Sequence, residues 1–126
     1  MKILVAEDEP MLLKTIELKL KKEGYEVMAC ADGREAVTQM ESREPDMVIT
    51  DIMMPFVSGL EIVSIVRQKI LRKIPIIILS AMEQEKIVME AFELGADDYI
   101  TKPFSLNELA IRVKKLMNQF GRDPIG

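Results

Sequence analysis

Polar side chains of complementary chemistry follow four of the apolar runs in this sequence. They comprise three carboxylates, a hydroxyl and an ammonium group, namely Glu7, Asp8, Asp51, Ser80 and Lys102. Because the carboxyl ends of parallel strands meet at one edge of a sheet, we expect these side chains to share a pocket. A single aspartate after a strand often only starts a turn. Four strand ends with matching chemistry indicate a functional site instead.

The three carboxylates predict a bound cation. Two unit charges about 4 Å apart repel by roughly 4 kcal/mol at an effective dielectric constant of about 20, and Lys102 offsets only one charge. Mg²⁺ binds one or two carboxylates together with waters, and it commonly serves phosphoryl transfer. A carboxylate can be the nucleophile in such a transfer. We therefore expect Asp51 to accept a phosphoryl group whose oxygens contact Mg²⁺, Lys102 and the Ser80 hydroxyl.

Hydrophobic periodicity predicts five strands that alternate with five helices. The predicted strands cover residues 2–6, 25–29, 47–50, 75–79 and 98–101. The predicted helices start at Pro10, near Glu35, at Ser58-Gly59, near Glu83 and after Ser105, and the last one extends to Phe120. The acid before Pro10 is expected to cap the first helix. Strict alternation favours a parallel sheet covered by helices on both faces.

Composition limits the class of protein and its chemistry. A chain of 126 residues suits one domain, placed at residues 1–120, with 121–126 as a tail or the start of a linker. The net charge of -4 argues against a nucleic-acid surface. The lack of histidine and the single cysteine, Cys30, exclude Ser-His-Asp and Cys-His catalysis and the usual zinc sites. No intramolecular disulfide, signal peptide or membrane span is possible from these residues, so we expect a cytoplasmic protein without membrane contact.

Four motifs together resemble the receiver domain of two-component response regulators, and the resemblance covers nearly the whole chain. The motifs are Ile3-Leu4-Val5-Ala6-Glu7-Asp8-Glu9, Asp51-Ile52-Met53-Met54-Pro55, Ser80-Ala81, and Gly95-Ala96-Asp97-Asp98-Tyr99-Ile100-Thr101-Lys102-Pro103-Phe104. The resemblance implies a CheY-like, flavodoxin-like (βα)5 domain with strand order 2-1-3-4-5. It also implies a phosphoacceptor switch that catalyses its own phosphorylation and dephosphorylation rather than an enzyme acting on other substrates.

The resemblance assigns roles to individual residues. It implies that a histidine kinase donates the phosphoryl group to Asp51, and that Asp8, Asp51 and the Met53 carbonyl hold Mg²⁺, with Glu7 acting through water. It further implies a cis peptide at Lys102-Pro103.

A conformational switch is implied as well. Ser80 is expected to move toward the phosphoryl group and Tyr99 to rotate inward, which biases the surface of the fourth helix, fifth strand and fifth helix. Without the resemblance, the pattern favours a half-buried strand aromatic at Tyr99 over a switch residue.

Three positions depart from the usual family pattern. Glu7 stands where Asp is frequent, and its extra methylene suits a water-mediated contact. Ser58 stands where Asp or Asn is common, which predicts a weaker helix cap. Met53 and Met82 flank the phosphoryl site, and their apolar side chains are poor at orienting an attacking water, which predicts slow autodephosphorylation.

The fourth helix carries apolar residues beyond its expected core stripe. Met89 and Phe92 lie off that stripe and predict an exposed patch with Ala110, although a more deeply buried helix explains them too. In regulators with winged-helix DNA-binding outputs, this region forms a phosphorylation-dependent homodimer. Asp98 and Arg112 match one ion pair of that dimer, whereas two others are broken by Val88 opposite Glu108 and by Asn118 opposite Asp97. The dimer is therefore expected to be weaker on ionic grounds. The apolar patch and the tail at 121–126 nevertheless favour transcription control through a DNA-binding domain, with a stand-alone receiver or a phosphorelay step as the alternative.

Other functions of the same fold fit the residues less well. A flavodoxin-like cofactor binder needs a phosphate cradle after the first strand, where this chain has Glu7-Asp8-Glu9. A haloacid-dehalogenase-type phosphatase needs a second acid two residues after Asp51, where this chain has Met53. A receiver-like domain that only binds partners is disfavoured because the whole set of acids, serine and lysine is present.

Overall fold

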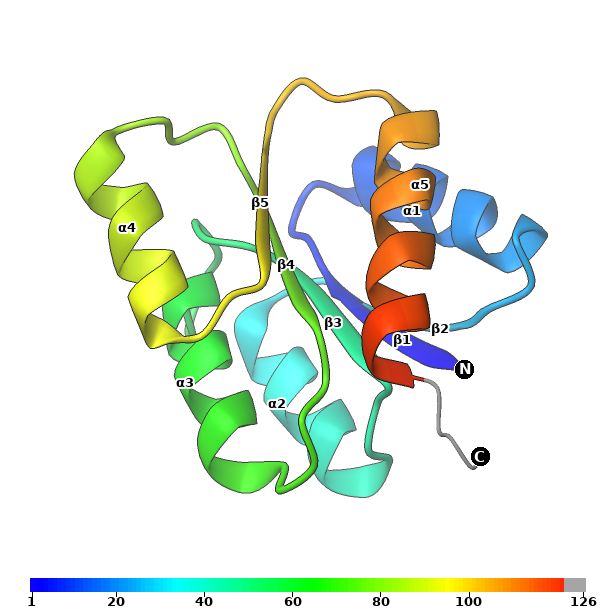
Figure 1. Ribbon diagram of the computed structural model, residues 1–126, viewed down its shortest axis with the longest axis horizontal. Coiled ribbons are helices and arrows are strands. Elements are labelled where there is room, and N and C mark those ends of the chain that lie inside the picture. The colour runs from blue at the N-terminus through cyan, green and yellow to red at the C-terminus, as the bar shows by residue number, and fades with distance from the viewer. Residues whose placement is uncertain (122–126) are drawn as a thin grey trace.

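A five-stranded parallel sheet forms the centre of the computed structural model, which describes residues 1–121 (Figure 1). The strands are β1 Lys2–Ala6, β2 Glu26–Cys30, β3 Met47–Asp51, β4 Ile76–Ser80 and β5 Asp98–Thr101. Their order is β2-β1-β3-β4-β5, which confirms the predicted order 2-1-3-4-5. The strand that ends in Asp51 therefore lies at the middle of the sheet.

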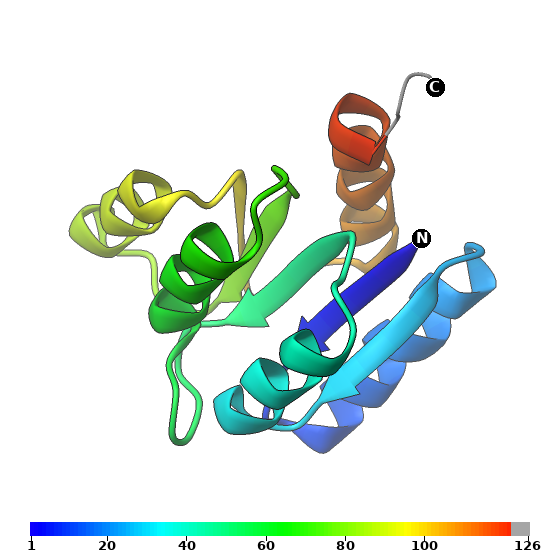
Figure 2. The same ribbon diagram turned by 90° about the horizontal axis from the view of Figure 1, so that it is seen from below.

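Two layers of helices cover the sheet (Figure 2). The helices are α1 Pro10–Lys22, α2 Gly33–Ser42, α3 Gly59–Lys69, α4 Glu85–Leu94 and α5 Leu106–Leu116, followed by the π-helix η1 Met117–Gly121. Helices α2, α3 and α4 share one core cluster with the sheet, and α1 and α5 share the other. Across residues 1–121, no helix is long and apolar enough to cross a membrane. The tail expected at 121–126 lies outside the described residues except for Gly121, which ends η1.

Alternation of side chains along the strands builds both cores. In β4, Ile76 and Ile78 pack toward α2, α3 and α4, while Ile77 and Leu79 pack toward α1 and α5. All five residues of β3 and of β4 are buried. Strands buried on both faces read as continuous apolar runs, which is why the sequence marks β4 so clearly.

Strands β3 and β4 each end one residue later than predicted, because a polar residue continues the backbone pairing. Asp51 and Ser80 were expected just after their strands, but they are the last residues of β3 and β4 and pair with Leu79 and Thr101. Helix α2 starts two residues earlier than predicted because the Glu35 amide donates to Asp32 Oδ1 at 2.8 Å.

Two predictions about helix caps are wrong. Glu9 precedes Pro10 at the start of α1 but makes no side-chain cap, because the shorter acids and hydroxyls are the residues that reach the first-turn amides. Ser58 was expected to cap α3 weakly, yet it forms a full capping box with Glu61. The Glu61 amide donates to Ser58 Oγ at 3.2 Å, and the Ser58 amide donates to Glu61 Oε1 at 2.8 Å.

The guanidinium group of Arg67 ties four elements together at the end of the sheet where the strands begin. It donates to the Gly95 carbonyl at 3.1 and 2.7 Å, to the Ile74 carbonyl at 2.7 Å and to Asp97 Oδ2 at 2.9 Å. The Ile76 amide donates to the same Asp97 oxygen at 2.8 Å. Arg67 in α3 thus fixes the C-terminal end of α4 against the first residues of β4 and β5.

Replacing Arg67→Ala is expected to lower the free energy of unfolding by about 2–3 kcal/mol, because it leaves half-buried carbonyls and the Asp97 carboxylate without their charged donor. The measurement is urea unfolding followed by circular dichroism. Lys69→Ala is the matched control on the same helix, since its contact with Glu41 is 4.0 Å long and exposed. Equal losses in the two variants would contradict the assigned role of Arg67.

Candidate functional site

The strands that carry or precede the predicted polar residues all end at one edge of the sheet, on the side of the loops that lead into α4 and α5 at the top of Figure 1. One ammonium group joins two of the acids. Lys102 Nζ donates to Glu7 Oε1 at 2.9 Å and to Asp51 Oδ2 at 2.8 Å. The prediction that these side chains share a pocket is therefore confirmed for the lysine and both acids.

The acids also form a set that could hold a metal ion. Glu7, Asp8 and Asp51 each offer a carboxylate oxygen, and the three oxygens lie within 4.8 Å of one another. Glu7 and Asp51 are 1% and 7% exposed, whereas Asp8 is exposed, so the set opens to solvent on one side. Three carboxylates against one ammonium leave an excess of negative charge, and oxygen ligands of this kind fit a hard divalent cation such as Mg²⁺.

Burial sets the electrostatics of this site. It raises the pKa of Glu7, and the hydrogen bond and charge of Lys102 lower that pKa only partly. For Lys102, burial alone would lower the pKa, but the hydrogen bonds and charges of Asp51 and Glu7 outweigh it, so the pKa of Lys102 is raised. Lys102 therefore stays an ammonium ion at neutral pH, and its contribution to stability is lost only as pH rises through that raised pKa.

Asp51 is held by the loop that follows it. Its Oδ1 accepts from the Ile52 amide at 2.7 Å, while Oδ2 accepts from Lys102. The Gly59 amide donates to the Ile52 carbonyl at 2.9 Å, and a Cβ at Gly59 would lie 1.9 Å from the Asp51 carbonyl oxygen. Only glycine allows this close return of the chain. The Met53 side chain is exposed, and the ligand role of its carbonyl stays a prediction.

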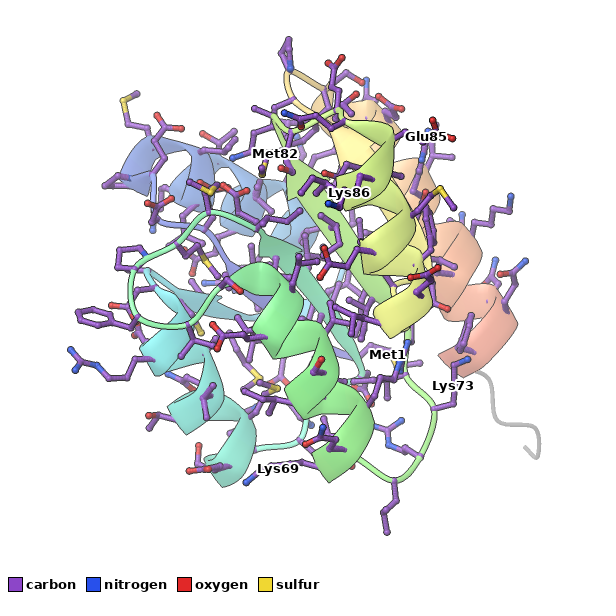
Figure 3. All side chains as sticks on the ribbon, turned by 90° about the vertical axis from the view of Figure 1, so that its left-hand side faces the viewer. Met1, Lys69, Lys73, Met82, Glu85 and Lys86 are labelled. Atoms are coloured by element: carbon purple, nitrogen blue, oxygen red, sulfur yellow. The ribbon has the colours of Figure 1, made fainter. Side chains whose placement is uncertain are left out.

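The side chains of Ser80 and Tyr99 both hydrogen-bond to the backbone of one residue, Met82. The Met82 amide donates to Ser80 Oγ at 3.0 Å, and the Tyr99 hydroxyl donates to the Met82 carbonyl at 2.7 Å. Met82 lies three residues before Glu85, the first residue of α4, and Figure 3 shows both residues at the N-terminal end of that helix. Tyr99 is half-buried and hydrogen-bonded to this loop, so the two residues predicted to switch are connected through the loop that leads into α4.

The turn after β5 has the predicted backbone. The Lys102-Pro103 peptide is cis, which confirms that expectation. The Lys102 amide donates to the Ser80 carbonyl at 2.9 Å, so the ends of β4 and β5 stay paired up to the functional lysine.

The surface of α4 and α5 carries the predicted apolar residues. Met89 and Phe92 are 53% and 45% exposed, so the alternative of a deeply buried α4 is wrong. Ala110 on α5 is partly buried and lines a pocket with Glu23, Asn107, Ile111 and Lys114, so its place in one patch with Met89 and Phe92 stays a prediction. Ile111 is 67% exposed and was missed, although its position off the stripe of buried residues Leu109 and Val113 is visible in the sequence.

The four charged residues discussed from the sequence for this surface are paired within the chain, namely Asp97, Asp98, Glu108 and Arg112. Arg112 donates to Asp98 Oδ1 at 2.8 Å and to Glu108 Oε2 at 3.0 Å, and Asp97 is held by Arg67. From the sequence, Asp98 and Arg112 were expected to form an ion pair between the two chains of a dimer. In the structure they form an ion pair within one chain.

The effect of burying Glu7 is testable through pH. We compare the free energy of unfolding of Glu7→Gln with that of wild type, both without metal, at pH 5 and at pH 7.5. The variant is expected to do better in this comparison at pH 7.5 than at pH 5. The pKa of Glu7 is raised in the folded protein, so the folded wild type takes up the Glu7 proton more readily than the unfolded chain does. Wild type therefore gains stability as the pH falls through the raised pKa. The variant lacks this gain because glutamine does not titrate. Urea unfolding with a chelator at both pH values measures the difference, and a difference independent of pH would contradict the raised pKa.

Known proteins similar to this chain share one type of domain. The family model described as the response regulator receiver domain matches residues 3–114. The Francisella response regulator 1452 receiver domain is 36% identical with a TM-score of 0.86, and the match covers 94% of this chain and 97% of that chain. A signal receiver domain of a signal transduction histidine kinase from Syntrophus aciditrophicus is 34% identical, with a TM-score of 0.87 and coverage of 97% and 93%. The BeF3-activated N-terminal receiver domain of Klebsiella pneumoniae RstA is 27% identical, with a TM-score of 0.84 and coverage of 93% and 98%.

Proposed function

The chain belongs to the response regulator receiver domain family, and we propose that Asp51 accepts a phosphoryl group from a histidine kinase and thereby switches the surface of α4, β5 and α5. Receiver domains are phosphorylated by such kinases. The observation that carries the proposal is the Lys102 ammonium group, which bridges Glu7 and Asp51 beside an acid set with an open side.

The proposed transfer is a displacement at phosphorus. An oxygen of Asp51 forms a bond to phosphorus while the bond from phosphorus to the donor's imidazole nitrogen breaks, and that nitrogen keeps the electron pair. Lys102 moves with its positive charge to a phosphoryl oxygen. Glu7, Asp8, Asp51 and the Met53 carbonyl would hold Mg²⁺, which neutralises phosphoryl charge when bound. The domain is thus a phosphoacceptor that also catalyses loss of the group, not an enzyme for other substrates.

The proposed switch runs through Met82. Phosphorylation replaces a charge of -1 by about -2 and adds acceptor oxygens. Ser80 is buried at the end of β4, the strand next to the one that ends in Asp51, and turning its hydroxyl to the phosphoryl group gives up the bond from the Met82 amide. The Met82 carbonyl holds the Tyr99 hydroxyl, so the loop and the uncapped N-terminus of α4 move together, while Arg67 fixes the other end of the helix.

Incubation with a small-molecule phosphodonor and Mg²⁺ is expected to add one phosphoryl group to the protein, observed as intact mass. Asp51→Asn removes the nucleophile and is expected to abolish the gain, and a chelator is expected to do the same. Asp32→Asn is the matched control, because asparagine also caps a helix and Asp32 is the N-cap of α2. No gain in wild type under any condition, or an equal gain in Asp51→Asn, would overturn the proposal.

The proposed output is a phosphorylation-dependent homodimer that controls transcription through a DNA-binding domain of a longer regulator. Support comes from the exposed Met89, Phe92 and Ile111 and from complementary charge, since α4 exposes several acids and α5 exposes Lys114 and Lys115. A phosphorelay role is the second candidate, and it is supported by the 34% identical receiver domain that is part of a histidine kinase.

Phe92→Asp is expected to keep the phosphorylated protein monomeric, because it places a carboxylate in the apolar centre of the proposed interface. Light scattering after size-exclusion chromatography measures the mass with and without the phosphodonor. Leu18→Asp is the control, since Leu18 is 56% exposed on α1 at the opposite face of the sheet. A phosphorylated wild type that stays monomeric, or a Phe92→Asp dimer, would remove the homodimer from the proposal.

A further inference from the structure

The turn after β3 contains a residue with a strained backbone. Burial of its side chain does not offset this strain. Phe56 has a φ of 72°, and it is the one non-glycine residue among the described residues with positive φ. The Val57 amide donates to the Pro55 carbonyl at 2.9 Å, which closes a three-residue γ-turn with Phe56 at its centre. Turns of this hand are rare and strained. Because the Phe56 side chain is 65% exposed, another contact must favour the turn.

That contact comes from the first turn of α2. The guanidinium carbon of Arg34 lies 3.9 Å from the centroid of the Phe56 ring, which is a close cation–π stack. Within residues 1–121, Arg34 has no ion pair with a carboxylate, and its guanidinium group contacts the aromatic ring of Phe56 instead. An exposed arginine held over an exposed ring stabilises the turn that presents the ring.

The backbone beneath the stack is also closely fitted. The Gly33 amide donates to the Pro55 carbonyl at 3.4 Å, and a Cβ at Gly33 would lie 1.9 Å from the Val57 carbonyl oxygen. Figure 2 shows the loop between β3 and α3 beside the first turn of α2. The base of the loop is fixed separately, where Gly59 returns against Asp51 and Ile52. The loop is thus held at its base by its own strand and at its tip by α2.

We propose that the stack of Arg34 on Phe56 is a latch through which α2 holds the β3–α3 loop in the conformation that the phosphoacceptor site needs. Both are positioning residues, because neither reaches the reacting atoms and both act through the loop. The inference rests on the proposed function, in which this loop supplies the Met53 carbonyl to the bound cation. The stack offsets the strain at Phe56, so its loss lets the loop leave the γ-turn and lowers the fraction of protein that can bind the cation.

Charge and latch predict opposite effects for one substitution. Arg34→Gln removes a positive charge, and by Coulomb's law alone this change favours cation binding. The latch predicts weaker binding, by roughly two- to five-fold, which is the equilibrium equivalent of an exposed cation–π contact. The sign of the change therefore separates the two explanations.

The experiment compares Arg34→Gln, Phe56→Leu and the double variant in two measurements. The first is hydrogen exchange of the Val57 amide by NMR with a chelator present, which reports the turn without any metal. The second is the Mg²⁺ dissociation constant from calorimetric titration. Each single variant is expected to speed Val57 exchange and weaken Mg²⁺ binding, and the double variant is expected to be no worse than either, because both remove the same contact.

Rescue and control variants make the test specific. Phe56→Tyr keeps an aromatic face and is expected to retain wild-type behaviour. Phe56→Gly removes both the stack and the strain, so it is expected to lose less affinity than Phe56→Leu. Arg43→Gln, just beyond the other end of α2, removes the same charge from an exposed contact of 3.4 Å and is expected to leave Val57 exchange unchanged.

Three results would overturn the latch: additive losses in the double variant, unchanged Val57 exchange in Arg34→Gln, or tighter Mg²⁺ binding by Arg34→Gln. If wild type does not bind Mg²⁺, the proposed function fails in its cation step. The exchange data then decide alone whether the stack holds the turn, so the two failures are distinguishable.

Discussion

The rest of the site depends on one ammonium group between two buried carboxylates. Glu7 and Asp51 are costly to bury unless a cation pairs with them, and Lys102 contacts both at under 3 Å. Lys102 is 95 residues from Glu7 and 51 residues from Asp51 in the sequence. The bridge therefore exists only when β1, β3 and the turn after β5 lie at the same edge of the sheet. The sheet order and the chemistry of the site are consequences of each other.

Helix α4 is held very differently at its two ends, and this difference makes it suitable as the moving element. Its C-terminal end is fixed by the Arg67 guanidinium group, which also contacts Asp97 and the start of β4. Its N-terminal end has no side-chain cap and is connected to the site through Met82. In the proposed switch, a displacement at Ser80 would therefore move the N-terminal end of α4 about its fixed C-terminal end. Among its ten residues only Ala91 is fully buried, so little packing opposes that movement.

The sequence predicts what periodicity and strand ends determine, and it does not predict contacts that depend on one side-chain conformation. The parallel sheet and the meeting of Glu7, Asp51 and Lys102 follow from alternating strands and helices, whereas the strand order was implied by the resemblance to receiver domains. The failed cap at Glu9 and the π-helix after Leu116 do not, because local hydrogen bonding decides them. The capping box was missed, although a serine followed three residues later by a glutamate, Ser58 and Glu61, is its sequence signature. The Arg67 contacts and the stack of Arg34 on Phe56 join residues distant in the chain and leave no periodic signal.

In the unphosphorylated site the buried polar groups already have hydrogen-bond partners. This limits the free-energy difference between the unphosphorylated and phosphorylated conformations. Within the described residues, no buried side-chain nitrogen or oxygen lacks a hydrogen-bond partner. A phosphoryl group on Asp51 would therefore exchange bonds rather than add them, since Lys102 leaves one oxygen for another and Ser80 leaves the Met82 amide. Exchanging one hydrogen bond for another has a small net free energy, on the order of 1 kcal/mol. Two states that differ by so little are the condition under which a single added charge can shift the population of a whole surface.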